Sequence, residues 1–148
     1  MAVSQILVPV TVHTRGDQLQ SALSEVIVIA RREPHTRVHL LAIQPPVSQY
    51  VTGYFRPDEL RQAQLDAALQ DLEEPRQLLD AALVRYKVHT RIGRSAPTIV
   101  AFAEEFGCDR VLMGRAGQAG VQEKLFGTLA NQVRHLLSAT GICQVIGY

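Results

Sequence analysis

Short apolar segments alternate with longer amphipathic segments along this chain of 148 residues. The apolar runs are rich in branched side chains, as expected for the strands of a buried sheet, and lie at 5–11, 37–43, 87–92, 110–113 and 142–146. The segments between them have helical spacing, and the first places Leu19, Ala22, Leu23, Val26, Ile29 and Ala30 on one face. Strands that alternate with helices are typical of right-handed crossovers, so we predict a parallel sheet with helices on both faces.

Prolines, a glycine and an acidic residue predict where several of these elements end. Asp17 is expected to cap the first helix, and Pro34 lies beyond its end. Pro75 falls inside the long helical segment after the second strand and should kink it or split it in two. Gly107 is the expected C′ residue of the next helix. Pro9 lacks a ladder donor and is therefore expected near the end of the first strand.

The composition restricts the partners and the compartment that we expect. The formal net charge is only +1, which disfavours nucleic acid as a main partner. Cys108 and Cys143 are far apart and form no C-x-x-C pair, so we predict two small buried side chains in a reducing setting. Segment 1–10 does not read as a signal peptide and no window approaches a membrane span. We expect one domain over 1–148, in the cytoplasm and without membrane insertion.

A cluster of glycines follows the fourth apolar run, at Gly114, Gly117, Gly120 and Gly127. Glycine loses more conformational entropy on folding than any other residue, so such a cluster needs a physical reason. The loop leaves the carboxyl end of a strand and enters a helix, where backbone N–H groups and a positive helix end form an anion site. A solvent-exposed loop whose glycines only cap the elements is the alternative.

Two common nucleotide-binding motifs are absent from the sequence. A Walker A loop needs G-x-x-x-x-G-K-[ST], and the chain has no such string. A dinucleotide fingerprint should follow the first strand, but "VTVHTRGD" has no G-x-G-x-x-G pattern. P-loop hydrolysis and Rossmann dehydrogenation are therefore disfavoured.

A third motif does match the glycine loop. From Gly114 through Gly117 to Gly127 and Thr128, the spacing is G-x2-G-x9-G-[ST]. It resembles the ATP-binding motif of the universal stress protein family. "ILVPV", "VHLLAI" and "IGRSAPTIVAFAEEFGCDRVLMG" are similar to other segments of that family, so the resemblance covers nearly the whole chain. It implies an α/β, Rossmann-like (adenine nucleotide alpha hydrolase-like) sandwich with five parallel strands ordered 3-2-1-4-5.

The resemblance also implies which residues hold the phosphates. Gly114 and Gly117 would offer backbone N–H groups, because glycine lets the backbone approach closely. Gly127 and the hydroxyl of Thr128 would hold the terminal phosphate or a metal bound to it. Arg115 lies inside the loop and could neutralise phosphate charge, with a solvated loop face as the alternative.

Other predicted site residues lie near the base and the ribose. Ile43 matches the position that packs against adenine, and Met113 would line the same cleft, with simple core packing as the alternative for both. Leu129, directly after the motif, completes the predicted set. Thr11 stands where the family usually has an Asp that helps to hold the nucleotide. A hydroxyl lacks the charge of a carboxylate, and losing a charge-assisted bond costs roughly 1.5–3 kcal/mol, or ten- to a hundredfold in affinity.

The function implied by the resemblance is adenine-nucleotide binding in a stress-response or regulatory role. ATP, with or without Mg²⁺, is the first expected ligand, and AMP or a cyclic adenine nucleotide is the alternative. No residue stands out as a general base, so we expect at most slow ATP hydrolysis. The different reading is a protein-interaction or transporter-regulating module with a degenerate nucleotide site. A hydrolase or transferase sharing the fold is a third reading.

The resemblance further implies a homodimer formed through the last strand. The segment "ICQVIGY" would otherwise be an unprotected apolar sheet edge, which favours the same interpretation. A regulatory protein partner is a second expectation. His35 and His39 straddle a turn and a strand and would not share a helix face, so we predict no metal site. No Ser/His/Asp or Cys/His arrangement has the local signature of a nucleophilic site, so we predict no catalytic residue.

Overall fold

The computed structural model describes residues 3–12, 14, 16–47, 56–114, 129–137 and 143–147. Its five strands form one parallel sheet in the order β3-β2-β1-β4-β5, which confirms the predicted fold class and strand order. The strands are β1 (Gln5–Val10), β2 (Arg37–Gln44), β3 (Tyr86–Ile92), β4 (Arg110–Gly114) and β5 (Gln144–Gly147). Strand β5 begins two residues later than the apolar run at 142–146 predicts.

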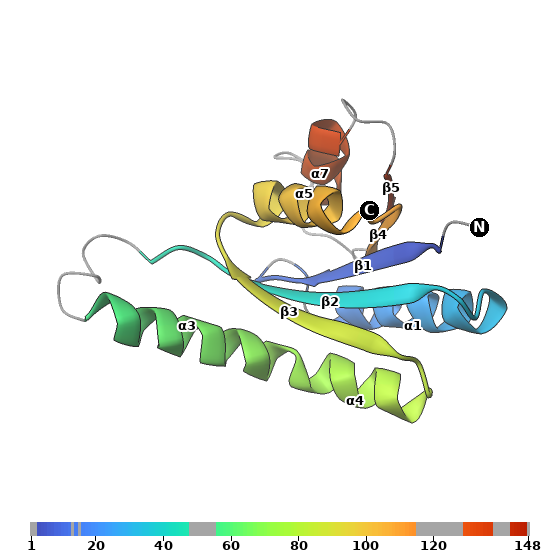
Figure 1. Cartoon of the computed structure of the whole chain (residues 1–148), viewed down its shortest axis with the longest axis horizontal. Coiled ribbons are helices and arrows are strands. Elements are labelled where there is room, and N and C mark those ends of the chain that lie inside the picture. Colours follow the sequence, from blue (N-terminus) through green and yellow to red (C-terminus); the bar gives the residue numbers. More distant parts are fainter. Residues whose placement is uncertain are drawn as a thin grey trace.

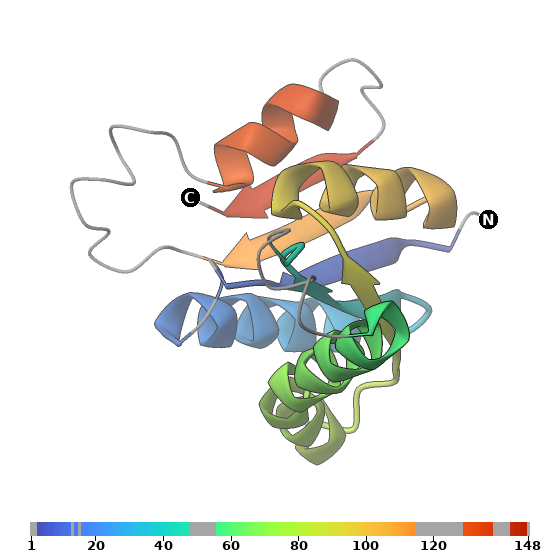
Figure 2. The same ribbon diagram turned by 90° about the vertical axis from the view of Figure 1, so that its left-hand side faces the viewer.

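The helices form a layer on each side of this sheet (Figures 1 and 2). One layer contains α1 (Asp17–Arg32), α3 (Pro57–Asp71) and α4 (Glu73–Ala81). The other contains α5 (Ser95–Phe106) and α7 (Leu129–Leu137), which contact each other. The predicted arrangement with helices on both faces is therefore confirmed.

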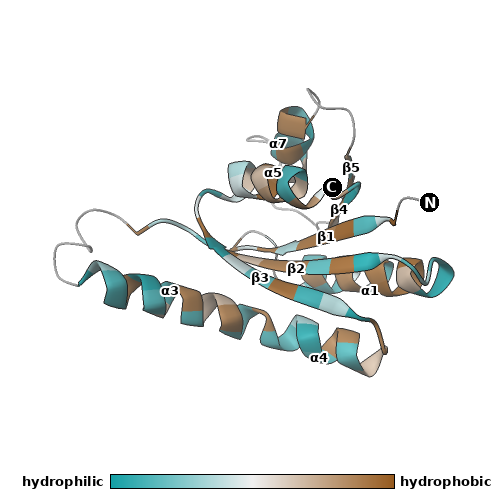
Figure 3. Cartoon of the chain, viewed as in Figure 1, coloured by the Kyte–Doolittle hydropathy of each residue, from teal (hydrophilic) through white to brown (hydrophobic). Residues whose placement is uncertain are grey.

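Each face of the sheet buries its own hydrophobic core, because successive residues of a strand point to opposite faces. On β2, Val38, Leu40 and Ala42 belong to the core beneath α1, α3 and α4. Leu41 and Ile43 belong to the core beneath α5 and α7. Figure 3 shows hydrophobic residues along the central strands, as expected for a sheet that is covered on both faces.

The predicted cap of the first helix is wrong by one residue. Gly16, with a φ of 61°, is the N-cap of α1 and no side chain caps it. Asp17 is instead the first helical residue. Its carboxylate still lies beside the positive end of the helix, which explains why an acidic residue suits this position.

Pro75 splits the long helical segment, as one of the two predicted outcomes. The break lies at Leu72, between α3 and α4, and not at the proline itself. A proline ring clashes with the carbonyl of the residue four positions earlier, which is Asp71, the last residue of α3. Gly107 caps α5 in the left-handed conformation with a φ of 64°, as predicted.

Pro9 lies one residue before the end of β1, where it pairs with Leu41 of β2. The N–H of Gln5 points to the β4 side, so by alternation residue 9 also faces that side. Pairing between β1 and β4 extends only over Ile6 and Leu7. Pro9, which has no N–H group to donate, therefore lies beyond the end of the hydrogen-bonded ladder between β1 and β4.

None of the helices in the described ranges is long and apolar enough to cross a membrane.

Candidate functional site

Four predicted site residues lie at the carboxyl edge of the sheet. Thr11 directly follows β1, Ile43 is the last but one residue of β2, and Met113 and Gly114 end β4. Parallel strands end at a common edge, which is where ligands bind in open α/β sheets. All four residues are buried.

Ile43 and Met113 belong to the same hydrophobic core, and Leu129, the first residue of α7, packs against it. The structure therefore brings together these three residues, which the sequence places 16 to 86 positions apart. Ile43 is 2% exposed and Met113 is 1% exposed, so both are core residues of the described structure. Arg115, Gly117, Gly127 and Thr128 lie outside the described residues.

Gly114 joins the end of β4 to the first turns of α1. Its φ is 73°, in the left-handed region that favours glycine. A Cβ at this position would overlap the backbone oxygen of Gln18 and lie 3.1 Å from the backbone nitrogen of Ala22. The Gln18 side chain also donates a hydrogen bond from Nε2 to the Met113 carbonyl, at 3.0 Å. Close packing of strand on helix thus requires this glycine, whatever the adjoining loop binds.

Thr11 and Thr14 form a buried turn at the end of β1. Thr14 donates from its hydroxyl to the Pro9 carbonyl at 3.1 Å, and accepts from the Thr11 N–H at 2.7 Å. The Thr14 N–H donates to the Thr11 carbonyl at 3.1 Å, which closes the turn. The two hydroxyl oxygens are 3.3 Å apart.

The Thr14 hydroxyl has one proton, which it donates to Pro9, so its oxygen only accepts from other neighbours. The Thr11 hydroxyl, 3.3 Å away, has one proton to donate and can also accept. Sequence reasoning placed Thr11 correctly at the strand end but did not predict its partner Thr14.

The described part of this edge carries no titratable side chain at the predicted site positions. Thr11, Ile43, Met113, Gly114 and Leu129 offer a hydroxyl acceptor, apolar surface and backbone groups. Such residues can position a neutral, flat group but cannot transfer a proton at neutral pH.

A pair of histidines lies away from this edge and was missed by the sequence analysis. His39 of β2 is buried, and its Nδ1 lies 3.0 Å from Nε2 of His89 on β3. The other nitrogen of His39 lies 2.8 Å from the side-chain oxygen of Gln5. An amide oxygen only accepts, so His39 donates to Gln5, and a neutral His39 then accepts at Nδ1 from His89.

Aromatic packing surrounds this pair. Phe102 and Phe106 of α5 stack with centroids 4.3 Å apart and contact both histidines at 4.7–5.8 Å. Burial, followed by the positive charge of neighbouring groups, lowers the pKa of His39 to about 4. Burial also lowers the pKa of His89. Alternation along each strand predicts that residues 37, 39 and 41 share one face of β2 and that residues 87, 89 and 91 share one face of β3. That His39 lies beside His89 follows only from the register between the two strands.

The two cysteines are free thiols at the amino end of β4 and before β5. Cys108 is buried and Cys143 is half-buried against the same core, so the prediction of two buried cysteines holds fully for Cys108. Burial raises the pKa of Cys108 to about 12 and that of Cys143 to about 11. Neither thiol is activated as a nucleophile. Within the described ranges, no three His, Cys, Asp or Glu side chains are grouped to hold a metal ion.

The chain is similar to known proteins both in sequence and in fold. A family model described as the universal stress protein family matches residues 3–139. A solved universal stress protein in complex with cAMP is 17% identical, with a TM-score of 0.68 over 99% of this chain and 98% of that chain. Universal stress protein UspA from Lactobacillus plantarum is 20% identical, with a TM-score of 0.68 over 99% and 98% of the two chains.

A third structure is a universal stress protein family protein from Arabidopsis thaliana with AMP bound. It is 17% identical, with a TM-score of 0.60 over 97% of this chain and 90% of that chain. A comparison with curated protein sequences finds no match. The solved structures share the fold, and because the family model spans residues 3–139, the chain belongs to the universal stress protein family.

Proposed function

We propose that this chain is an adenine-nucleotide-binding regulatory protein of the stress-response type, with ATP as its first ligand. The observation that carries the proposal is the G-x2-G-x9-G-[ST] spacing that begins at Gly114, at the carboxyl edge of the sheet. Two of the similar solved structures are named as complexes with cAMP and with AMP. AMP and cyclic AMP are therefore the alternative ligands.

The proposed phosphate half of the site is formed by the glycine loop. Gly114 and Gly117 offer backbone N–H groups to the phosphates, and Arg115 adds positive charge. Gly127 and Thr128 hold the terminal phosphate or its Mg²⁺ ion. The nucleotide orders this loop and thereby changes the surface that a regulatory partner contacts.

The proposed base and ribose half is formed by Ile43, Met113, Leu129 and Thr11. Ile43, Met113 and Leu129 share one apolar core, which suits the face of an adenine ring. The Thr11 hydroxyl, at the end of β1, forms a hydrogen bond with the ligand. None of these residues is a general base, so we propose no catalytic role and at most slow ATP hydrolysis.

Calorimetric titration with ATP, ADP, AMP and cyclic AMP, with and without Mg²⁺, tests this function. Gly117→Val should abolish ATP binding, because a side chain blocks the approach of phosphate. Thr11→Val keeps the shape of the side chain and removes one neutral hydrogen bond, so affinity should fall about two- to tenfold. The matched control is Thr36→Val, which removes a buried hydroxyl that has no hydrogen-bond partner among the described residues.

The outcomes of this titration separate the two function classes. Loss of ATP binding in Gly117→Val with binding kept in Thr36→Val supports the phosphate role of the loop. Binding of AMP or cyclic AMP alone assigns the altered specificity to the Thr11 end. Absence of binding at about millimolar concentration favours the alternative, a protein-interaction or transporter-regulating module with a degenerate site.

We further propose a cytoplasmic homodimer that pairs through β5, within one domain over 1–148. Strand β5 (Gln144–Gly147) pairs with β4 on one side and is the last strand of the sheet. An unpaired strand edge is a template for pairing with a second copy. Sedimentation velocity across a range of protein concentrations measures whether the dimer forms.

A further inference from the structure

The turn between α4 and β3 carries a leucine where the backbone favours glycine. Leu83 has a φ of 60° and is the only non-glycine residue with a positive φ in the described part of the chain. Its N–H donates to the Asp80 carbonyl at 3.1 Å, and the Val84 N–H donates to the Leu79 carbonyl at 3.0 Å. These two bonds form a Schellman ending of α4, in which the left-handed residue is usually glycine because a Cβ is strained there.

The side chain of Leu83 is also far more exposed than any other large hydrophobic side chain of the described residues. It is 91% exposed, whereas Leu69 and Val28, which come next, are each 48% exposed. Burial therefore offsets little of the backbone strain, and the stability of the fold does not account for a leucine at this position. Proteins break such local rules mainly at functional sites, which points to a binding role for this side chain.

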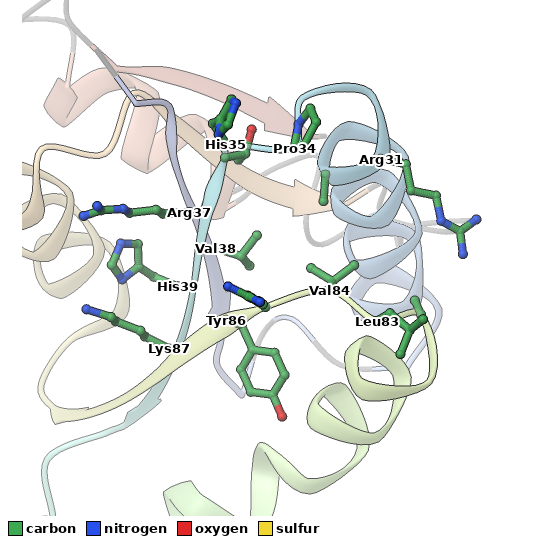
Figure 4. Close-up of a pocket in the computed structure, with 14 residues that line it drawn as sticks. Arg31, Pro34, His35, Arg37, Val38, His39, Leu83, Val84, Tyr86 and Lys87 are labelled. Carbon is green, nitrogen blue, oxygen red and sulfur yellow. The ribbon is translucent and has the colours of Figure 1, made fainter. Parts of the chain in front are cut away.

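This turn lies at the amino edge of the sheet, where β2 and β3 begin (Figure 1). The connection from α1 to β2 lies beside it, because residues of both connections line one hollow of about 650 Å³ (Figure 4). The proposed nucleotide site lies at the opposite edge. Ile43 at that edge follows Arg37 by six residues along β2, so at a rise of about 3.3 Å per residue the two edges are roughly 20 Å apart.

Two arginines flank the exposed leucine. Arg31, in the last turn of α1, and Arg85, two residues after Leu83, line the same hollow as Leu83. Figure 4 shows Arg31 and Leu83 on the same side of the two strands, whereas Arg37 and Lys87 point to the other side. Neither Arg31 nor Arg85 forms an ion pair with a described residue. The negative end of α1 favours Arg31, but Arg85 lies four residues beyond the end of α4.

The two connections carry a local excess of positive charge. Segments 31–37 and 80–87 contain five basic and two acidic residues, a net charge of +3, whereas the whole chain has a net charge of +1. Both acidic residues have partners: Glu33 forms an ion pair with Arg110 at 3.1 Å, and Asp80 accepts a hydrogen bond from a tyrosine hydroxyl at 2.8 Å. The exposed leucine is therefore set in a cationic surface.

A protruding apolar side chain beside free cations suits the surface of an anionic lipid bilayer. The leucine can reach the boundary between headgroups and acyl chains, while each arginine rests its apolar stem on the surface and binds lipid phosphate. A protein partner would have to offer a pocket of matching shape, whereas a bilayer adapts to a side chain that projects from a turn. Each arginine close to an anionic leaflet strengthens binding about fivefold.

We infer that the amino edge docks on an anionic lipid surface, with Leu83 in the headgroup region and Arg31 and Arg85 on lipid phosphates. The contact is peripheral, because a single turn makes it and no helix enters the bilayer. It is weak and reversible, since firm attachment takes a larger apolar anchor or more cations. The inference is independent of the proposed nucleotide function, because the two surfaces lie at opposite edges of the sheet.

Flotation of the full chain with lipid vesicles tests the inference. The vesicles are phosphatidylcholine with about a third phosphatidylglycerol, compared with phosphatidylcholine alone, at about 0.15 M salt so that diffuse attraction is screened. We expect binding to the anionic vesicles and at least tenfold weaker binding to the neutral ones. Leu83→Ala should weaken binding about tenfold. The matched control is Leu69→Ala, which shortens an exposed leucine of α3 and should leave binding unchanged.

Two further variants separate binding from folding and from overall charge. Leu83→Gly should lose binding although its free energy of unfolding does not fall, a combination that a purely structural leucine would not give. Arg31→Gln combined with Arg85→Gln should weaken binding tenfold or more. Its control combines Arg61→Gln with Arg94→Gln, two exposed cations in α3 and before α5.

Several results would overturn the inference. Equal weakening in the two double arginine variants would show that only overall charge matters. Unchanged binding of Leu83→Ala, or no binding to the anionic vesicles, would remove the role of the leucine. Competition by soluble glycerol phosphate would indicate a pocket for a free phosphate ester instead of a lipid surface. Loss of dimers in Leu83→Ala by sedimentation velocity, without vesicle binding by the unchanged chain, would assign this edge to a second copy of the chain.

Discussion

The two edges of the sheet are built from different kinds of residue. At the carboxyl edge, Thr11, Met113 and Gly114 are buried, uncharged and tied to their neighbours by hydrogen bonds or close backbone packing. At the amino edge, Arg37 and Lys87 are exposed cations without an ion-pair partner in the described part of the chain. The carboxyl ends of β1 and β4 therefore present a preorganised neutral surface, and the amino ends of β2 and β3 present an unbalanced charge.

This difference explains what each edge can bind. Backbone groups and a single hydroxyl acceptor select a ligand by shape, because their positions are set by packing. Solvated cations select a ligand by its charge, and the strength of that attraction depends on the ionic strength. Substitutions at the carboxyl edge should therefore cost stability, whereas those at the amino edge should change pH dependence or cost little.

Gly114→Ala should give the largest effect of the substitutions considered, a loss of about 3 kcal/mol in the free energy of unfolding. The added Cβ would overlap the Gln18 backbone, in addition to the strain of a left-handed residue. Gly107→Ala is the matched control, since its φ is 64° but no atom lies within 4 Å of the added Cβ. Urea denaturation measures both, and equal losses would contradict a packing role for Gly114.

Acidification should weaken the amino half of the sheet next most strongly. The pKa of His39 is lowered from 6.5 to about 4 by burial and then by His89, Lys87 and Arg37. The unfolded chain therefore binds a proton first, and stability should fall as the pH drops from 6.5 to about 4. Allowing for screening, the loss is about 2 kcal/mol.

A variant pair checks the source of this pH dependence. His39→Gln should flatten the curve of unfolding free energy against pH in that window, because the titrating ring is gone. The control variant is His35→Gln, which removes an exposed imidazole ring. A slope that persists in His39→Gln would assign the pH dependence to other groups, such as His89 beside Arg91 and Glu105.

Thr14→Val should cost about 1.5 kcal/mol at the carboxyl edge. The change leaves the Thr11 N–H and the Pro9 carbonyl without the hydroxyl that they share. Thr14→Ser keeps that hydroxyl and should cost less than the Val variant, through loss of one buried methyl group. Thermal unfolding of the two variants measures the difference, and a more stable Val variant would show that the turn does not depend on the hydroxyl.

Leu83→Gly should have the smallest effect, a gain of about 0.5 kcal/mol at the amino edge. Leu83 has a φ of 60° and its side chain is 91% exposed, so glycine relieves strain and removes little packing. Leu69→Gly is the contrast, because Leu69 is also exposed but lies within α3, where glycine costs about 1 kcal/mol. Equal destabilisation by both changes would mean that Leu83 packs usefully in solution.

Much of the fold could be predicted because the signals are local. Buried strands are continuous apolar runs, and Pro75 and Gly107 mark helix ends through their own backbone constraints. The cap at Asp17 was misplaced because Gly16 takes the positive φ and the acidic residue enters the helix instead. Helix signals of this kind are accurate only to a residue or two.

Less of the candidate site could be predicted, because its contacts join distant segments. The sequence indicates that Gly114 needs to be glycine but attributes this to phosphate, whereas the structure gives it a backbone contact with Gln18, 96 residues earlier. The partnership of His39 and His89 likewise requires the register of β2 on β3. The motif at 114–128 indicates the ligand class that we propose, but it contains no information on these contacts between distant segments.

By itself, the sequence determined the alternation of strands and helices, the helix breaks and the family resemblance, because each depends on residue type and spacing along the chain. Only the tertiary structure decided which glycine packs on a helix, which histidines are hydrogen-bonded to each other and where the cations gather. Those features depend on strand register and sheet order, which bring residues about 50 to 100 positions apart into contact. No local pattern encodes such a distance, because it arises only when the whole sheet is assembled.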